Sequence, residues 1–199
     1  MMTTRPRGRP AAGDRRDAIL AAALRCFVER GFHGTAIPVI AARARISPGT
    51  IYHYFANKDA LVNALYRKWK GEVARRVFAA FPQVAPPREQ FAVLWREMVA
   101  FAREQPTAFA FVEFHHHASY LDAESQSIDR ELKQFGAMMV KRAQGEGLLK
   151  PVAPELLMEL VFGAFNGVVR AHQEGRVELT DERFAAVEAA CWDAVAVHG

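Results

Sequence analysis

Cysteine, strand patterns and long apolar runs are all scarce in this chain of 199 residues. Its two cysteines, Cys26 and Cys191, lie far apart and inside apolar helical patterns, which is typical of small buried hydrophobic residues. Their placement argues against a disulfide framework or a zinc site. It also suits the reducing environment of the cytoplasm, where disulfides are rare.

The longest apolar stretch runs from Leu156 to Val169 and is interrupted by Glu159 and Asn166. It is too short and too polar to span a membrane, which takes about 20 apolar residues. No apolar segment of the secretory type follows the start of the sequence. We therefore expect a cytoplasmic protein that has no membrane partner.

Helical periodicity, in contrast, runs almost from end to end of the sequence. There is no period of 20–50 residues of the kind that indicates a solenoid. The pattern predicts an all-α fold of about nine helices, with boundaries at Gly, Pro and capping residues. The predicted helices are 14–30, 37–44, 48–54, 57–78, 88–104, 107–119, 124–144, 155–174 and 181–197.

Positive charge gathers at one end of the sequence. Residues 1–58 contain 10 Lys and Arg against 3 Asp and Glu, whereas residues 59–199 contain 16 against 19. A basic head on a mildly acidic body indicates that the head meets a polyanion such as nucleic acid. The alternative is a chance fluctuation in a solvated surface. We expect residues 1–13 to be a flexible basic arm, residues 14–58 a DNA-binding head and residues 59–199 a body.

The three short predicted helices of the head have the spacing of a helix-turn-helix. Ile51 and Phe55 are four residues apart, so they share the inward face of the third helix. The outward face can then enter a major groove, which is wide enough for one helix. The expected core of the head is Phe27, Ile37, Ile40, Ala41, Ile46, Ile51 and Phe55, and the expected outward residues are Pro48, Gly49, Thr50, Tyr52, His53 and Tyr54.

These residues resemble a known family. The sequence GFHGT at 31–35, IA at 40–41 and SPGTIYHYFANKDAL at 47–61 is similar to the N-terminal pattern of the TetR family of repressors. The match is dense over residues 15–61, whereas the rest of the chain resembles the family only in size and helical character. The resemblance implies a ligand-responsive repressor without cofactor or catalytic activity. It further implies a homodimer that a small-molecule effector releases from a palindromic operator.

The sequence departs from the family pattern at two positions. Arg45 stands where the family usually has the turn glycine, and Ala36 stands where a hydroxyl residue commonly caps the second helix. If the turn needs a positive φ at Arg45, that residue strains it. Arg45 can instead add a phosphate contact. These departures concern the geometry of the turn and not the membership of the family.

Carried over residue by residue, the resemblance implies that Thr50, Tyr52, His53 and Tyr54 face DNA, together with Pro48 and Gly49. It also implies that Lys58 and the N–H groups at Ala36 and Ile37 meet phosphates. Tyr52 and Tyr54 have the alternative role of packing aromatics. His53 has no core position in this register.

The arm contains an Arg-Gly-Arg-Pro sequence that is similar to an AT-hook. Arg7 and Arg9 would then lie in a narrow minor groove, where the negative potential is strong. The alternative is a solvated tail that adds affinity through the release of counterions alone.

For the body, the resemblance implies a small-molecule pocket, while ordinary core packing is the alternative for any single aromatic residue. Polar residues inside apolar stretches are better indicators, because a pocket needs a few directed hydrogen bonds. The candidate ligand-binding residues are Trp95, Phe101, Phe109, Glu113, His116, His117, Tyr120, Phe135, Met139, Phe162 and Asn166.

The final two predicted helices are apolar on more than one face, which indicates more than one packing partner. They either pack on their own monomer or form a four-helix bundle with a second copy, and the resemblance favours the dimer. The candidate interface residues are Leu157, Val161, Ala164, Val168, Phe184, Val187, Cys191 and Val195.

Two other functions remain open at this point. Glu113 and His116 form one E-x-x-H pair, with His117 beside it, whereas helical dimetal enzymes use two such pairs and two further glutamates. We therefore expect no metal site, and a metal-dependent oxidase or hydrolase would leave the helix-turn-helix unexplained. An architectural DNA binder would use the head and arm without sequence preference, so its binding would depend on salt and not on palindromes.

Overall fold

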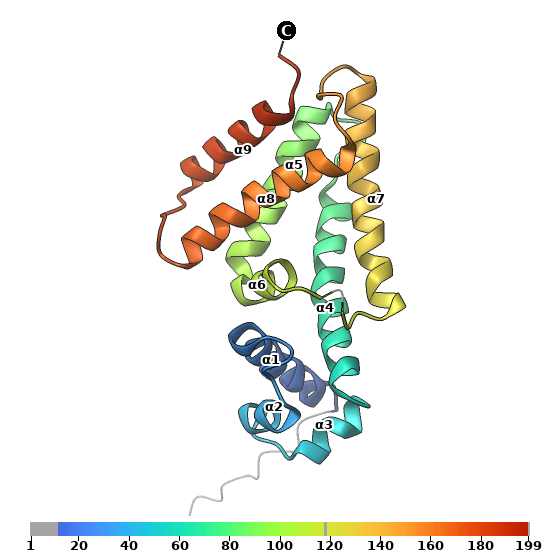
Figure 1. The fold of residues 1–199 in the computed structure, drawn as a ribbon, viewed down its shortest axis with the longest axis vertical. Coiled ribbons are helices and arrows are strands. Elements are labelled where there is room, and N and C mark those ends of the chain that lie inside the picture. Colours follow the sequence, from blue (N-terminus) through green and yellow to red (C-terminus); the bar gives the residue numbers. More distant parts are fainter. Residues whose placement is uncertain (1–11, 118, 199) are drawn as a thin grey trace, which may run out of the picture. The chain divides into compact units, whose positions relative to one another are not determined.

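The computed structural model describes residues 12–117 and 119–198, so Arg7 and Arg9 of the arm lie outside the described residues. Within this part of the chain the structure contains nine helices and no strand, which confirms the all-α prediction (Figure 1). The helices are α1 Ala12–Arg30, α2 Ile37–Ala44, α3 Pro48–Tyr54, α4 Lys58–Ala80, α5 Pro87–Glu104, α6 Pro106–Phe114, α7 Ala123–Gly145, α8 Pro154–Gln173 and α9 Asp181–Val195.

The chain divides into two compact units within α4, after Leu65. The predicted boundary between head and body lay at residue 58, seven residues earlier. The first two turns of α4 therefore belong to the head, where Leu61, Val62 and Leu65 are fully buried. None of the described helices is long and apolar enough to cross a membrane.

The core of the first unit forms where helical spacing predicts it. Phe27, Ile40, Ala41 and Ile51 are almost completely buried, but Ile46, which was expected in this core, is only half-buried. Helix α1 ends at Arg30 and is followed by Gly31, whose φ of +69° is the left-handed conformation that glycine adopts without steric cost.

The turn between α2 and α3 is built on backbone and capping interactions. Arg45 has φ 55° and ψ 46°, the left-handed conformation that its side chain disfavours. The N–H of Ile46 donates to the carbonyl of Ala41 at 3.0 Å and closes the end of α2. Ser47 caps α3 by accepting from the N–H of Thr50, whereas Ala36 offers α2 no side-chain cap.

The left-handed turn predicts that Arg45→Gly stabilises the protein. Glycine removes the steric cost at this φ, and the gain is about 0.5–1 kcal/mol after its larger unfolded-state entropy is included. Ala44→Gly, one residue earlier in helical conformation, is the matched control and should lower stability by up to about 1 kcal/mol. Urea denaturation of the full chain measures both changes. Equal destabilisation by the two variants would show that the turn is not strained.

Helix α6 ends at Phe114, five residues before the predicted end at 119. His117 is buried, and its Nε2 lies 2.6 Å from the carbonyl oxygen of Phe111. A continuing helix would use that carbonyl for the N–H of His115, so the imidazole competes with the helical hydrogen bond. His115 is extended, and His116 lies beyond the helix. The predicted helical E-x-x-H pair is therefore wrong, because Glu113 and His116 do not share a helix.

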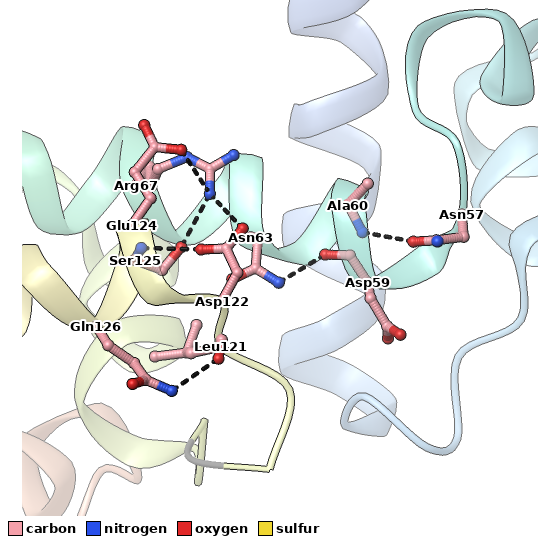
Figure 2. Close-up of polar contacts among 10 residues, drawn as sticks. All are labelled: Asn57, Asp59, Ala60, Asn63, Arg67, Leu121, Asp122, Glu124, Ser125 and Gln126. Carbon is pink, nitrogen blue, oxygen red and sulfur yellow. Dashed lines mark hydrogen bonds and ion pairs between the residues drawn. The ribbon is translucent and has the colours of Figure 1, made fainter.

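Polar contacts fix the start of α7 and its link to α4 (Figure 2). The carboxylate of Asp122 accepts from the backbone N–H of Ser125 at 2.9 Å and caps α7. The guanidinium of Arg67 donates to the same carboxylate at 2.7 Å and to the Ser125 hydroxyl at 3.1 Å. Further along the second unit, Arg88 of α5 forms a bidentate ion pair with Glu188 of α9.

Candidate nucleic-acid interface and effector region

Helix α3 presents two unlike faces. Ile51 of α3 and the extended residue Phe55 that ends the helix are 0% and 5% exposed, whereas Tyr52 is 54% exposed and His53 is exposed beside it. Tyr54 is half-buried, and its ring meets the His53 ring edge-on at 5.4 Å. The remaining outward candidates are half-buried Thr50 and exposed Pro48 and Gly49. One apolar face is thus covered by the head, and an aromatic and hydrogen-bonding face is left for a partner.

The positively charged side chains of the head are not equally available to bind phosphate. Arg43 forms a bidentate pair with Glu29 at 2.6 and 2.7 Å, and this pairing lowers the pKa of the Glu29 carboxyl. Arg45 at the turn is exposed. The Ile37 side chain is buried, so only its backbone could reach a phosphate, and Ala36 beside it is exposed. Arg45 is therefore the better-placed phosphate contact of the two arginines.

Lys58 has an internal partner that the sequence did not predict. Its ammonium donates to the carbonyls of Phe32 at 2.9 Å and of Thr35 at 3.1 Å, and it lies 4.1 Å from the centre of the Phe32 ring. The Thr35 hydroxyl in turn donates to the carbonyls of Cys26 and Gly31. Lys58 thus links the start of α4 to the loop between α1 and α2. This geometry favours a structural role over the phosphate contact that the family resemblance implies.

Lys58→Met tests these two roles, because it keeps the apolar stem and removes the charge. We expect stability to fall by about 1–2 kcal/mol, since two charge-assisted hydrogen bonds are lost at a half-buried site. The slope of log affinity against log salt for a random duplex should stay unchanged, whereas Arg45→Ala should reduce it by about 1. Anisotropy titrations at several salt concentrations measure the slopes. A reduced slope with unchanged stability would assign Lys58 to phosphate instead.

The candidate ligand-binding residues divide into separate groups. Trp95, Phe101, Phe109 and His117 are buried, whereas His116 and Phe162 are exposed. The rings of Phe101 and Phe109 lie 6.3 Å apart in one aromatic cluster. Phe135 belongs to another cluster, where it meets Phe78 at 5.1 Å and Phe81 at 4.8 Å. The half-buried candidates are Glu113, Tyr120, Phe135, Met139 and Asn166.

His117 is the centre of a buried hydrogen-bonded group. Its Nε2 faces the Phe111 carbonyl, which can only accept, so this nitrogen carries the proton. Its Nδ1 then accepts from the Tyr120 hydroxyl at 2.8 Å, and the Tyr66 ring lies 4.9 Å away. Burial lowers the pKa of the imidazole to about 4 and raises the pKa of Tyr120 to about 12. His117 is therefore neutral at physiological pH.

A network of ion pairs lies beside this group. Lys70 of α4 reaches Glu113 of α6 at 3.2 Å and Asp129 of α7 at 3.6 Å, and Lys133 pairs with Asp129 at 2.8 Å. Sequence reasoning missed Lys70, because the pattern does not separate it from Lys68, which also flanks Trp69 but is exposed. Among the described residues no three His, Cys, Asp or Glu side chains group as metal ligands would.

The lowered pKa of His117 predicts a pH-dependent stability. In the unfolded chain the His117 imidazole is protonated below about pH 6.5, whereas in the folded protein it is protonated only below about pH 4. The unfolded state therefore binds more protons between these pH values, and stability falls as the pH drops through this window. The loss attributable to His117 is about 2 kcal/mol between pH 7.5 and pH 5. His117→Gln should remove most of it, and His116→Gln, at an exposed neighbour, should not. Urea midpoints at both pH values test this, and identical pH profiles of all three proteins would exclude it.

The predicted dimer residues lie at different depths in the second unit. Leu157 and Val195 pack together with Ala143 and Leu149 in one apolar cluster within the same chain. Phe184 and Cys191 are also buried. These four side chains are covered by their own chain, so they are not available to a second copy. Of the remaining candidates, Ala164 is exposed and Val161, Val168 and Val187 are half-buried.

The fold and the two-faced α3 define the class: a helix-turn-helix DNA-binding protein with a separate helical domain. Residues 19–65 match the sequence model described as bacterial regulatory proteins, tetR family. Residues 68–197 match the one described as tetracyclin repressor-like, C-terminal domain. The second match alone covers more than half of the chain. The chain therefore belongs to the TetR family of transcriptional regulators.

Individual relatives agree with this assignment. The HTH-type transcriptional regulator BetI of Brucella canis is 33% identical over 109 residues, which is 54% of this chain and 55% of that protein. The chain thus matches about half the length of this relative. A TetR family regulator structure from Marinobacter aquaeolei has a TM-score of 0.82 at 27% identity, over 94% of this chain and 97% of the other. AibR, solved with isovaleryl coenzyme A and operator DNA, has a TM-score of 0.70 at 24% identity, over 89% and 96%.

Proposed function

We propose that the protein is a ligand-responsive, sequence-specific repressor that leaves a palindromic operator when a small molecule binds its second unit. The observation that carries this proposal is the exposure of Tyr52 and His53 on the face of α3 opposite buried Ile51 and Phe55. A short helix of this kind can enter the major groove and contact base edges. Arg45, exposed at the preceding turn, would meet the phosphate backbone.

The proposed operator is palindromic because we propose a homodimer. The exposed face of α8 carries Leu156, Leu160, Gly163, Ala164 and Gly167 at helical spacing, with Leu156 at 62% and Leu160 at 51% exposure. The exposed face of α9 carries Ala186, Ala190 and Ala194. Such small residues let helices approach closely, so two copies could pair their α8 and α9 helices in a four-helix bundle. These exposed residues replace the four buried ones in the proposed interface.

The proposed effector acts through α4, which is one continuous helix of 23 residues. Its start is held in the first unit by Lys58, and its later turns carry Arg67 and Lys70 in the ion pairs of the second unit. A ligand that favours one arrangement of these pairs would shift the DNA-binding equilibrium by its differential affinity, typically about 1–3 kcal/mol. AibR, which has this fold, was solved in complex with isovaleryl coenzyme A and operator DNA. Such a regulator would work in the cytoplasm.

Selection of bound sequences from random duplex DNA tests the proposal. We expect an enriched palindrome whose half-sites are about one helical turn, near 34 Å, or a multiple apart. Enrichment without two-fold symmetry would contradict the dimer. Binding without any enrichment would favour the alternative of an architectural protein, which depends on salt alone.

Substitutions on the exposed face of α3 test the residues that we propose contact base edges. Tyr52→Ala and His53→Ala should each lower the ratio of specific to non-specific affinity about tenfold, because a base contact contributes about 1–3 kcal/mol of discrimination. His33→Ala, which removes an exposed histidine elsewhere in the same unit, is the matched control. Competition binding with the selected palindrome and a random duplex measures the ratio. Unchanged ratios in both α3 variants would show that this face does not read DNA.

A further inference from the structure

The helix-turn-helix is poor in the side chains that identify bases by hydrogen bonds. Residues 36–56, which include α2, the turn and α3, contain no Asn, Gln, Asp, Glu or Lys. Arg, Asn and Gln identify bases by pairs of hydrogen bonds. Arg43 is held by Glu29 through two hydrogen bonds, and Arg45 lies at the turn before α3. The exposed face of α3 itself therefore has no side chain that can form such a pair with one base.

One side of this exposed face is apolar instead. Pro48 and Tyr52 are four residues apart, so they share a side of the helix, and both are exposed. Tyr52 is the only exposed large apolar side chain among the described residues of the first unit. The Thr50 hydroxyl lies 2.9 Å from the Ser47 hydroxyl and is already hydrogen-bonded within the chain. Pro48 and Tyr52 together form what we call the apolar strip of α3.

Exposed arginines stand at both ends of α3. Arg45 precedes the helix. Arg16 of α1 lies 5.3 Å over the ring of Phe55, the residue that follows the helix. Stacking uses the face of a guanidinium, so its N–H groups remain at the edge for phosphate oxygens. Positive charge at both ends of an apolar strip suits the major groove, which is about 12 Å wide and bordered by two phosphate backbones.

We propose that the protein recognises its operator through C5-methyl groups of thymine, which contact the apolar strip of Pro48 and Tyr52. The proposal rests on the proposed function and names the chemical feature of DNA that α3 reads. In the major groove the thymine methyl is the apolar group of the base edges, whereas the other groups are hydrogen-bond donors and acceptors. Its burial against the Tyr52 ring removes apolar surface of both partners from water.

The polar groups of the same face discriminate less well between bases. A tyrosine hydroxyl can donate or accept, so Tyr52 tolerates either kind of polar base edge. A single hydrogen bond from His53 to N7 does not distinguish guanine from adenine, because both bases carry this acceptor. A methyl contact distinguishes thymine from the other three bases, since only thymine has this group.

Selection from two libraries of random duplexes tests the proposal with the full chain. One library contains thymidine, and the other contains deoxyuridine in its place, which removes the C5-methyl and keeps the base pair. We expect the sequence that is enriched from the first library not to be enriched from the second. Equal enrichment from both would overturn the methyl contact and leave the repressor proposal in place. No enrichment from either library would reject sequence-specific binding, and both proposals with it.

Single substitutions locate the contact within the selected sequence. Each thymine of a half-site is replaced by uracil, together with its symmetry mate in the other half-site. At one such pair or more, we expect affinity to fall about fifteenfold, which is about fourfold for each apolar carbon that is no longer buried. Uracil in the flanking sequence is the control and should leave the affinity unchanged. Competition binding at one salt concentration measures these changes, and an unchanged affinity at every pair would contradict the proposal.

Variants assign the methyl preference to the Tyr52 ring. Tyr52→Phe keeps the ring and removes the hydroxyl, so the preference for thymine over uracil should stay at about fifteenfold. Tyr52→Ala should abolish most of it, and Pro48→Ala should reduce it in part. Tyr52 is exposed, so its substitution removes no core contact. A preference that persists in Tyr52→Ala would assign it to the shape of the duplex, and its loss in Tyr52→Phe would assign it to the hydroxyl. Either result would overturn the proposal.

Discussion

The candidate DNA-binding surface depends on one constraint, which is the burial of Ile51 and Phe55 in the hydrophobic core of the head. A helix of seven residues does not persist alone in water, because the cost of nucleating it exceeds the gain from its few hydrogen bonds. Burial of these two side chains and the Ser47 cap together fix α3. Tyr52 and His53 are exposed as a consequence of this burial, because helical geometry directs their side chains away from the core that Ile51 enters.

The second unit relies on aromatic packing combined with ion pairs that join its helices. Rings of α5, α6 and α8 meet edge to face around Phe165, while Lys70 draws carboxylates of α6 and α7 to α4. Partly buried pairs of this kind contribute little net stability, but breaking one leaves a charge without its partner. Such an arrangement favours one packing of helices over close alternatives. It also makes the packing sensitive to a molecule that competes for any of the polar groups.

Local chemistry decided which parts of this structure could be predicted from the sequence. The bounds of α2 and α3 were predicted to the residue, because Pro38, Ser47 and Pro48 act through backbone geometry that needs no tertiary information. The end of α6 could not be predicted, because the competing acceptor for the Phe111 carbonyl is a side chain that the fold itself brings there. The role of Lys58 was missed for the same reason, since its acceptors are carbonyls of a loop more than twenty residues earlier. For α8, the sequence periodicity indicated several apolar faces. It could not indicate that the face with Leu157 packs against other residues of the same chain.

Both cysteines of the chain are free and buried, and burial raises the pKa of each thiol. Oxidants and electrophiles attack the thiolate, so a thiol that is hard to ionise and shielded from solvent reacts slowly. Neither Cys26 nor Cys191 is therefore suited to sense peroxide while the protein is folded. A cysteine that becomes reactive toward a thiol-labelling reagent would therefore report that the unit containing it has opened locally.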